Sequence, residues 1–131
     1  FVRISTAYFL PRPRLMKELI QAANRGVRVE IIIPGLSDVP MVKWAAYRVL
    51  RKCLKNKIHF YEYEKAILHS KYLVIDETFA AVGSTNLNHR SFLHDLELEV
   101  CFTQQDHVLR VIEEFHREKS FSQKLHLENL D

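Results

Sequence analysis

The stretch that decides the fold is HSKYLVID at residues 69–76, followed by GSTN at residues 83–86. Tyrosine and branched aliphatic side chains fill the first stretch, which predicts a β-strand over residues 70–75. Alternate residues of a strand share a face, so His69 and Lys71 point the same way with Cα atoms about 6.7 Å apart. The pattern predicts an imidazole and an ammonium group beside one small anion.

The GSTN cluster is expected at the same end of the sheet. A second strand, predicted over residues 79–82, follows the first through a hairpin turn and runs back beside it. Gly83 permits close approach of the backbone, and the hydroxyl of Ser84 and the amide of Asn86 can donate hydrogen bonds. A nucleophile, a cation and neutral donors around one point suit a phosphoryl group, whose transfer mainly requires positioning and charge stabilisation.

Asp76 is not expected to join this group. It lies seven positions after His69, so on a straight strand it faces the other side of the sheet. We therefore expect it to make a structural hydrogen bond at the end of the strand. The alternative interpretation of the whole stretch is structural: a histidine packed in a sheet, a lysine on a strand edge and a turn that contains Gly-Ser.

The rest of the chain predicts an α/β fold with a mixed, largely parallel β-sheet flanked by helices. Strand, helix and strand follow one another within about thirty residues, which is typical of a βαβ unit with a parallel sheet. We assign residues 1–120 to one domain and residues 121–131 to a polar, frayed C-terminal tail. Beyond the hairpin, the hydrophobic periodicity predicts strands at 2–5, 27–33, 58–63 and 96–102 and helices after Pro11 and Pro13, at 38–54 and at 106–119.

The predicted helix at 38–54 has two open interpretations. Asp38 is a good N-cap, and one side of the helix carries core-type residues. Another side combines aromatic and basic residues, which suits either a membrane interface or a solvated helix with a half-buried tryptophan. These residues are Trp44, Tyr47, Arg48, Arg51 and Lys55.

Composition limits the function classes. The chain has 131 residues, 47% hydrophobic and 27% charged, which indicates a soluble globular domain rather than a disordered or fibrous one. The net charge of +3 permits an anionic partner without requiring one. Cys53 and Cys101 form no CxxC pair, so we expect two buried thiols rather than a disulfide framework or a zinc site. The chain opens inside a predicted strand, so we expect a domain of a longer protein, in which any membrane anchor would lie elsewhere.

The gapless pattern HxKxxxxDxxxxxxGSxN resembles the HKD signature of the phospholipase D superfamily. The resemblance covers residues 2–120 and is strongest to the C-terminal HKD half of bacterial cardiolipin synthases. Ala7 and Asn88 stand where these enzymes more often carry Pro and Asp. The matching stretches are TAYF at 6–9, AANRGV at 22–27, PGLSD at 34–38, IHFYEY at 58–63 and NLNHRS at 86–91, with a glutamate at 97.

The resemblance implies a phospholipase D-like half with a two-step displacement. One motif histidine attacks phosphorus and another protonates the leaving oxygen, so a second HKD half is required, from the same polypeptide or a homodimer mate. Glu97 resembles the carboxylate that orients a motif histidine, and Glu99 is its alternative. No metal or cofactor is implied. The resemblance assigns catalytic roles to His69, Lys71, Ser84, Asn86 and Glu97, structural roles to Asp76 and Gly83, and substrate binding to Tyr8 and Arg90.

Three functions follow from the resemblance. The first is a phosphatidyltransferase, a cardiolipin synthase that converts two phosphatidylglycerols into cardiolipin and glycerol. The second is a phosphodiesterase or nuclease that acts as an HKD homodimer, for which a net charge of +3 is low, so a nucleic-acid partner is not expected. The third is a degenerate half kept for structure. The first function implies a bacterial inner-membrane location, on its cytoplasmic or peripheral face, through the parent protein, with this domain itself soluble.

Overall fold

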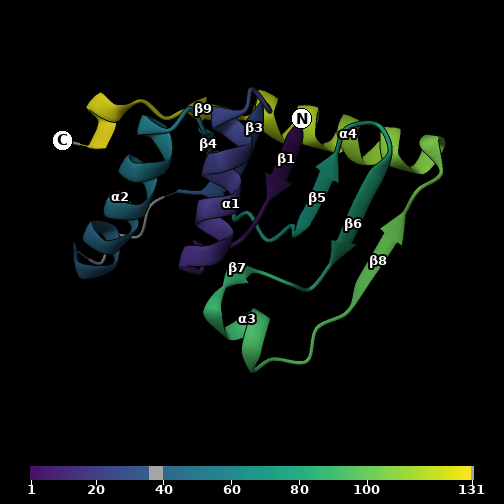
Figure 1. Ribbon diagram of the computed structural model, residues 1–131, viewed down its shortest axis with the longest axis horizontal. Coiled ribbons are helices and arrows are strands. Elements are labelled where there is room, and N and C mark those ends of the chain that lie inside the picture. The colour runs from purple at the N-terminus through teal and green to yellow at the C-terminus, as the bar shows by residue number, and fades with distance from the viewer. Residues whose placement is uncertain (36–39, 131) are drawn as a thin grey trace.

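The computed structural model describes the backbone of residues 1–35 and 40–130, and the side chains of residues 1–35 and 45–130. A seven-stranded sheet in the order β8-β6-β5-β1-β3-β4-β9 forms the centre of this part of the chain (Figure 1). A separate pair, β2 with β7, lies below it. The elements are β1 Val2–Ser5, β2 Phe9–Leu10, α1 Pro13–Asn24, β3 Val29–Pro34, α2 Pro40–Lys55, β4 His59–Tyr63, β5 Tyr72–Ile75, β6 Phe79–Gly83, β7 Leu87–Asn88, α3 His89–Leu93, β8 Glu99–Phe102, α4 Gln105–Ser120, β9 Ser122–Lys124 and a 3₁₀ turn, η1, Leu127–Leu130.

The predicted βαβ unit is confirmed, because β1 and β3 pair in parallel and α1 connects them. Pro13 occupies the first position of α1, where a missing N–H costs nothing. Gly26 follows the helix with φ of 97°, a left-handed conformation that turns the chain into β3 and that glycine adopts without steric cost.

The seven-stranded sheet is mixed as predicted, but it is not largely parallel. Within the described residues, its only parallel pairs are β1 with β3 and β3 with β4. The hairpin from β5 to β6, the pairing of β6 with β8, and the pairings of β1 with β5 and β4 with β9 are antiparallel. The physical reason lies in the connections: between β4 and β8 the chain has no helix long enough to cross the sheet, so it returns directly and forms antiparallel neighbours.

The sheet has a hydrophobic layer on each face. In β3, Ile31 and Ile33 pack with α1 and α2, while Ile32 packs on the face covered by α4. Figure 1 shows α1 and α2 over the β1, β3 and β4 half of the sheet and α4 crossing behind the strands. The face over β5, β6 and β8 opposite α4 therefore has no helix like α1 on it. Within the described ranges, no helix combines the length and apolarity needed to cross a bilayer.

The expectation of a frayed C-terminal tail is wrong. Ser122–Lys124 forms β9 and pairs antiparallel with β4. The side chains of Leu125 and Leu130 are buried in the core that α1 and α2 cover. The segment is too short and too polar to show a periodic pattern, and two spaced leucines suffice to hold it on the sheet.

The C-terminal segment also bears on the two interpretations of α2. The guanidinium of Arg51 donates a hydrogen bond of 2.8 Å to the carbonyl oxygen of Leu130, and Tyr47 packs against the core. Part of the aromatic and basic side of α2 is thus occupied by the protein itself. Asp38 and the Trp44 side chain lie outside the described residues. Cys53 is buried as expected, whereas Cys101 is exposed on β8, so the prediction for Cys101 is wrong.

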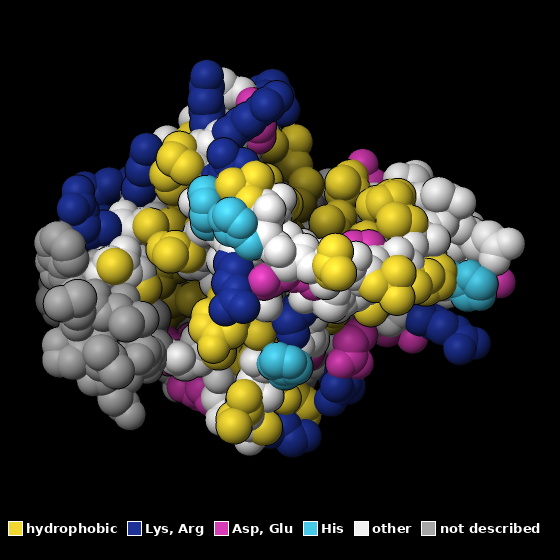
Figure 2. All heavy atoms as spheres, turned by 90° about the horizontal axis from the view of Figure 1, so that it is seen from below, with side chains coloured by type: hydrophobic (Ala, Val, Ile, Leu, Met, Phe, Trp, Pro, Cys, Tyr) yellow, Lys and Arg dark blue, Asp and Glu magenta, His cyan; other side chains and the backbone are white. Residues whose placement is uncertain are grey.

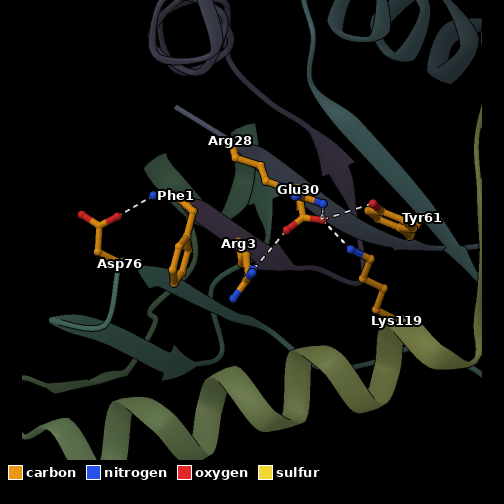
Figure 3. A network of polar contacts seen from close by, with 7 residues as sticks. All are labelled: Phe1, Arg3, Arg28, Glu30, Tyr61, Asp76 and Lys119. Atoms are coloured by element: carbon orange, nitrogen blue, oxygen red, sulfur yellow. Dashed lines mark hydrogen bonds and ion pairs between the residues drawn. The ribbon is translucent and has the colours of Figure 1, made fainter. Parts of the chain in front are cut away.

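The buried carboxylate of Glu30 on β3 holds the C-terminal end of α4 to the sheet (Figure 3). Its side chain is fully buried and accepts hydrogen bonds from Arg3 at 3.1 Å and Lys119 at 2.5 Å. Tyr61 and Arg28 donate to the same carboxylate. Burial raises the pKa of Glu30, but the hydrogen bonds from Lys119 and Arg3 outweigh it and lower the pKa to about 2.

Acid should therefore unfold this protein partly through Glu30. Its pKa is lower in the folded than in the unfolded state, where about 4.3 is usual, so its stabilisation is complete above that value and is lost as pH falls toward 2. We expect the free energy of unfolding, measured in urea at a series of pH values, to drop across this window. In Glu30→Gln the free energy of unfolding at neutral pH should be lower than in the wild type, and its decrease as pH falls should be smaller. A drop of unchanged size in Glu30→Gln would contradict the assignment.

The C-terminus of α2 is followed by a strained residue. Lys57 has φ of 64°, in the same left-handed region that Gly26 adopts after α1. A side chain in this region costs about 1 kcal/mol. We expect Lys57→Gly to raise the free energy of unfolding by somewhat less than that, because glycine also adds entropy to the unfolded chain. Gly26→Ala, where the added methyl group would meet open space, should lower it by a similar amount through conformation alone. Urea denaturation measures both changes.

Candidate active site

His69 and Lys71 lie in the segment directly before β5, which begins two residues later than predicted. The ammonium of Lys71 donates a hydrogen bond of 2.7 Å to the carbonyl oxygen of His69. The imidazole of His69 is exposed and, within the described part of the chain, has no hydrogen bond, ion pair or ring contact. An unpartnered imidazole next to a cation can approach an electrophile without first breaking an interaction.

The residues that alternate with them are fixed on the opposite face. The hydroxyl of Ser70 donates to Oε1 of Glu118 and the hydroxyl of Tyr72 donates to Oε2, each at 2.7 Å. Ser5 on β1 also contacts the Ser70 hydroxyl at 2.8 Å. Burial, followed by the charge of Glu118, raises the pKa of Tyr72, so its proton stays in the hydrogen bond. Since side chains alternate along an extended segment, anchoring Ser70 and Tyr72 turns the side chains of His69 and Lys71 the other way.

Gly83 joins the second cluster to the first. Its N–H donates to the carbonyl oxygen of Lys71 at 3.1 Å. A Cβ at this position would lie 2.1 Å from the carbonyl oxygen of Leu98 and 2.5 Å from Cδ of Glu99. No side chain fits between these strands, so the glycine is required by the close approach of the neighbouring backbone.

Ser84 connects the cluster to the acidic strand. Its hydroxyl donates to Oε2 of Glu97 and accepts from the N–H of Leu98 at 3.0 Å. These contacts hold Glu97 as an ionised acceptor, because hydrogen bonds from Ser84 and Ser91 and the charge of Lys71 lower its pKa. The alternative residue, Glu99, accepts from the N–H of Thr85 at 2.9 Å and lines the cavity beside Lys71. Glu99 thus belongs to the cavity wall, whereas Glu97 is held on Ser84.

A cavity of about 430 Å³ lies on the uncovered face of the sheet. Of the residues predicted to be catalytic, Lys71 lines this cavity, whereas His69, Ser84, Asn86 and Glu97 do not. Lys71, Thr85, Ser91 and Glu99 are among its polar residues, and the remaining walls are mainly apolar. Asn86 lies next to this region: its N–H donates to Ser91, while its Oδ1 is buried and has no hydrogen-bond partner among the described residues. An unpaired buried acceptor is costly, and only the N–H₂ group of the same amide could donate a hydrogen bond to an anion.

Not every predicted residue joins the cluster. Asp76 lies at the far end of β5 with φ of 50°, and its carboxylate contacts the backbone nitrogen of Phe1 (Figure 3). Arg90 is paired with Asp95 at 3.0 Å and points away into solvent with 80% of its side chain exposed. Tyr8 is exposed in the loop between β1 and α1, at the same end of the sheet. Glu97 contacts Ser84 and not His69.

Comparison with known proteins identifies the family of the chain. Residues 1–119 match the family model described as cardiolipin synthase, PLD-like domain. The chain belongs to the phospholipase D-like family. Among its curated relatives, the probable cardiolipin synthase YwiE of Bacillus subtilis is 31% identical over 122 residues, which are 93% of this chain and 24% of that protein. Cardiolipin synthase 2 of Staphylococcus epidermidis is 34% identical over 125 residues, 95% of this chain and 25% of the relative.

The chain therefore spans about a quarter of the length of the curated relatives that it matches. Solved structures share its fold. The phospholipase D family member Nuc from Salmonella typhimurium superimposes with a TM-score of 0.79 at 21% identity, covering 95% of this chain and 81% of Nuc. Phosphatidylserine synthase from Haemophilus influenzae gives a TM-score of 0.79 at 18% identity, covering 99% of this chain and 35% of that enzyme.

Sequence reasoning missed the supports of this phospholipase D-like site. Glu118 escaped notice although it falls three residues after Phe115, on the apolar stripe of α4 where a carboxylate needs partners. Ser91, whose hydroxyl accepts from Asn86, gave no signal beyond its place in NLNHRS. Short elements, β2, β7 and α3, were also missed, because two-residue strands have no detectable period.

Gly83→Ala should disrupt this site and destabilise the fold. The added methyl group would overlap the backbone of Leu98, and we expect the free energy of unfolding to fall by about 2–3 kcal/mol. The matched control is Gly35→Ala, whose methyl group would meet only the flexible Glu62 carboxylate at 3.3 Å. Urea denaturation of both variants measures the difference, and equal stabilities would refute the steric argument.

Proposed function

We propose that the protein is a phosphatidyltransferase of the phospholipase D type, a cardiolipin synthase in which this chain supplies one of two HKD motifs. The observation that carries the proposal is the unpartnered imidazole of His69 beside the Lys71 ammonium, with Ser84 held next to them. The curated relatives named as cardiolipin synthases support the choice of substrate, phosphatidylglycerol.

The first chemical step forms a covalent intermediate. A neutral imidazole nitrogen of one motif histidine attacks the phosphorus of phosphatidylglycerol and forms a P–N bond. The P–O bond to the terminal glycerol breaks, and the departing oxygen takes a proton from the second motif histidine. Lys71 stabilises the negative charge on the non-bridging oxygens, which grows in the transition state. The side-chain N–H₂ group of Asn86 can add a hydrogen bond, and so can Ser84 once its hydroxyl proton turns from Glu97 to the phosphate.

The second step regenerates the histidine. The hydroxyl of a second phosphatidylglycerol loses its proton to the histidine that acted as acid and attacks phosphorus. The P–N bond breaks and cardiolipin is released. Because water at the same position would yield phosphatidic acid instead, the apolar walls of the cavity favour transfer over hydrolysis by limiting water.

One HKD motif provides one histidine, so the proposal requires a second half, from the same polypeptide or from a homodimer mate. Two observations support a missing neighbour. His69 has no carboxylate partner within the described residues, although Glu97 is ionised nearby. Val82 on β6, Val100 on β8 and Leu98 just before β8 are exposed at 36%, 51% and 74%. The parent protein would carry the association with a bacterial inner membrane.

The test compares His69→Ala with a matched variant, His126→Ala, in which an exposed histidine outside the motif is removed. With the second HKD half supplied and phosphatidylglycerol in mixed micelles, we expect cardiolipin from the wild type and from His126→Ala, and a rate lower by about 10³-fold or more from His69→Ala. Phosphatidylglycerol labelled at phosphorus should leave acid-labile label on the wild-type protein.

Full activity of His69→Ala would overturn the mechanism. Cleavage of bis-p-nitrophenyl phosphate by a dimer of this chain, with no cardiolipin formed, would instead favour the phosphodiesterase or nuclease function. A protein inactive on both substrates even when a second HKD half is supplied would favour the degenerate half.

A further inference from the structure

The end of the sheet that carries the candidate site also carries an exposed surface of mixed apolar and basic residues. We call it the rim and define it by its residues: Tyr8, Leu10, Arg12 and Arg14 from β2 and the start of α1, and Arg90, Phe92 and Leu93 from α3. Its apolar side chains are between 46% and 64% exposed. Figure 2, which views the molecule from this end, shows hydrophobic, basic and histidine side chains intermixed on the surface.

The rim is one surface because β2 and β7 pair. Phe9 lies opposite Leu87 and Leu10 opposite Asn88 in a parallel register. The hydroxyl of Thr6 adds a link, accepting from the N–H of Leu87 at 3.3 Å. Since α3 begins immediately after β7, this pairing places Phe92 and Leu93 beside the chain that enters α1.

The rim is continuous with the candidate site. Phe92 lines the 430 Å³ cavity that contains Lys71. Phe92 also lines a neighbouring depression of about 340 Å³ together with Arg12, Arg14 and Leu15. A single aromatic side chain therefore separates the cavity at Lys71 from the two arginines.

Two of the three rim arginines, Arg12 and Arg14, carry charge that no acidic side chain in the described part of the chain neutralises, whereas Arg90 is paired with Asp95. Among the described residues, neither Arg12 nor Arg14 forms an ion pair, although Glu18 lines the same depression. Half-exposed apolar side chains next to uncompensated guanidinium groups are the combination that lies at the interface of an anionic bilayer. A second copy of the chain is a poorer occupant, because a twofold contact would bring like charges together.

We propose that the rim docks on a bilayer that contains anionic phospholipid and delivers the lipid headgroup to the cavity at Lys71. The inference rests on the proposed function for the identity of the lipid. Leu10, Phe92 and Leu93 enter the interfacial region, while Arg12 and Arg14 contact lipid phosphates.

Vesicle sedimentation tests the electrostatic part. Vesicles of phosphatidylcholine mixed with phosphatidylglycerol should bind the protein more tightly than vesicles of phosphatidylcholine alone, and added salt should reduce the difference. The double variant Arg12→Gln/Arg14→Gln should bind the mixed vesicles about 25-fold more weakly, or about fivefold for each arginine. The control Arg25→Gln, at the other end of α1, should bind like the wild type.

A second set of substitutions tests how much the apolar side chains of the rim contribute to vesicle binding. Leu10→Ser/Leu93→Ser should weaken binding to mixed vesicles about tenfold. Leu127→Ser, a leucine of similar exposure on the C-terminal segment, is its control. Unchanged binding in both double variants, equal loss in the controls, or a changed oligomeric state with unchanged vesicle binding would each overturn the proposal.

The docking surface and the proposed function can be tested independently of each other. The rim variants leave the cluster at His69 intact, so their cleavage of bis-p-nitrophenyl phosphate should equal that of the wild type. Vesicle binding as expected without cardiolipin formation would leave the docking surface standing and remove the proposed function. Cardiolipin formation, together with rim variants that bind vesicles normally, would support the proposed function and overturn the docking surface.

Discussion

The carboxylate of Glu118 joins α4 to the segment that carries the candidate nucleophile, and the geometry of the site depends on it. Both of its oxygens are used, one by Ser70 and one by Tyr72. Burying a carboxylate is unfavourable unless such donors replace water, so the three groups are constrained together. Because Ser70 is held toward α4, its two neighbours His69 and Lys71 must face the open side of the sheet.

A second constraint acts from the other side of the site. The backbone of Leu98 approaches Gly83 so closely that β8 determines where Ser84, Glu97 and Glu99 lie. Glu118 positions the histidine and lysine, and the contact at Gly83 positions the acids and hydroxyls. The hydrogen bond from Gly83 to Lys71 connects the two sets. The candidate site is therefore assembled by backbone pairing, one buried carboxylate, and the hydrogen bonds that Glu97 and Glu99 accept from Ser84 and Thr85.

Much of this could be predicted from sequence, and the failures have physical causes. The spacing of HSKYLVID and GSTN indicated which side chains share a face, because alternation in a strand is a local property. β5 starts later than the sequence predicts, since its neighbour β1 ends at Ser5, which pairs with Tyr72. Neither β9 nor the burial of Leu130 was foreseen, because both depend on contacts with β4 and α2. The prediction of a largely parallel sheet was wrong because it extended the parallel pairing of one βαβ unit to the whole sheet.

Side chains alternate along residues 69–74, so residues needed for folding and residues proposed for the chemistry lie at neighbouring positions. Ser70, Tyr72 and Val74 face α4 and are needed for folding. His69 and Lys71 face outward and carry no contact on which the fold depends. A descendant of this chain could lose its histidine and still fold. Loss of chemistry and loss of structure are thus independent events at adjacent positions, and a silent half can persist beside an active one.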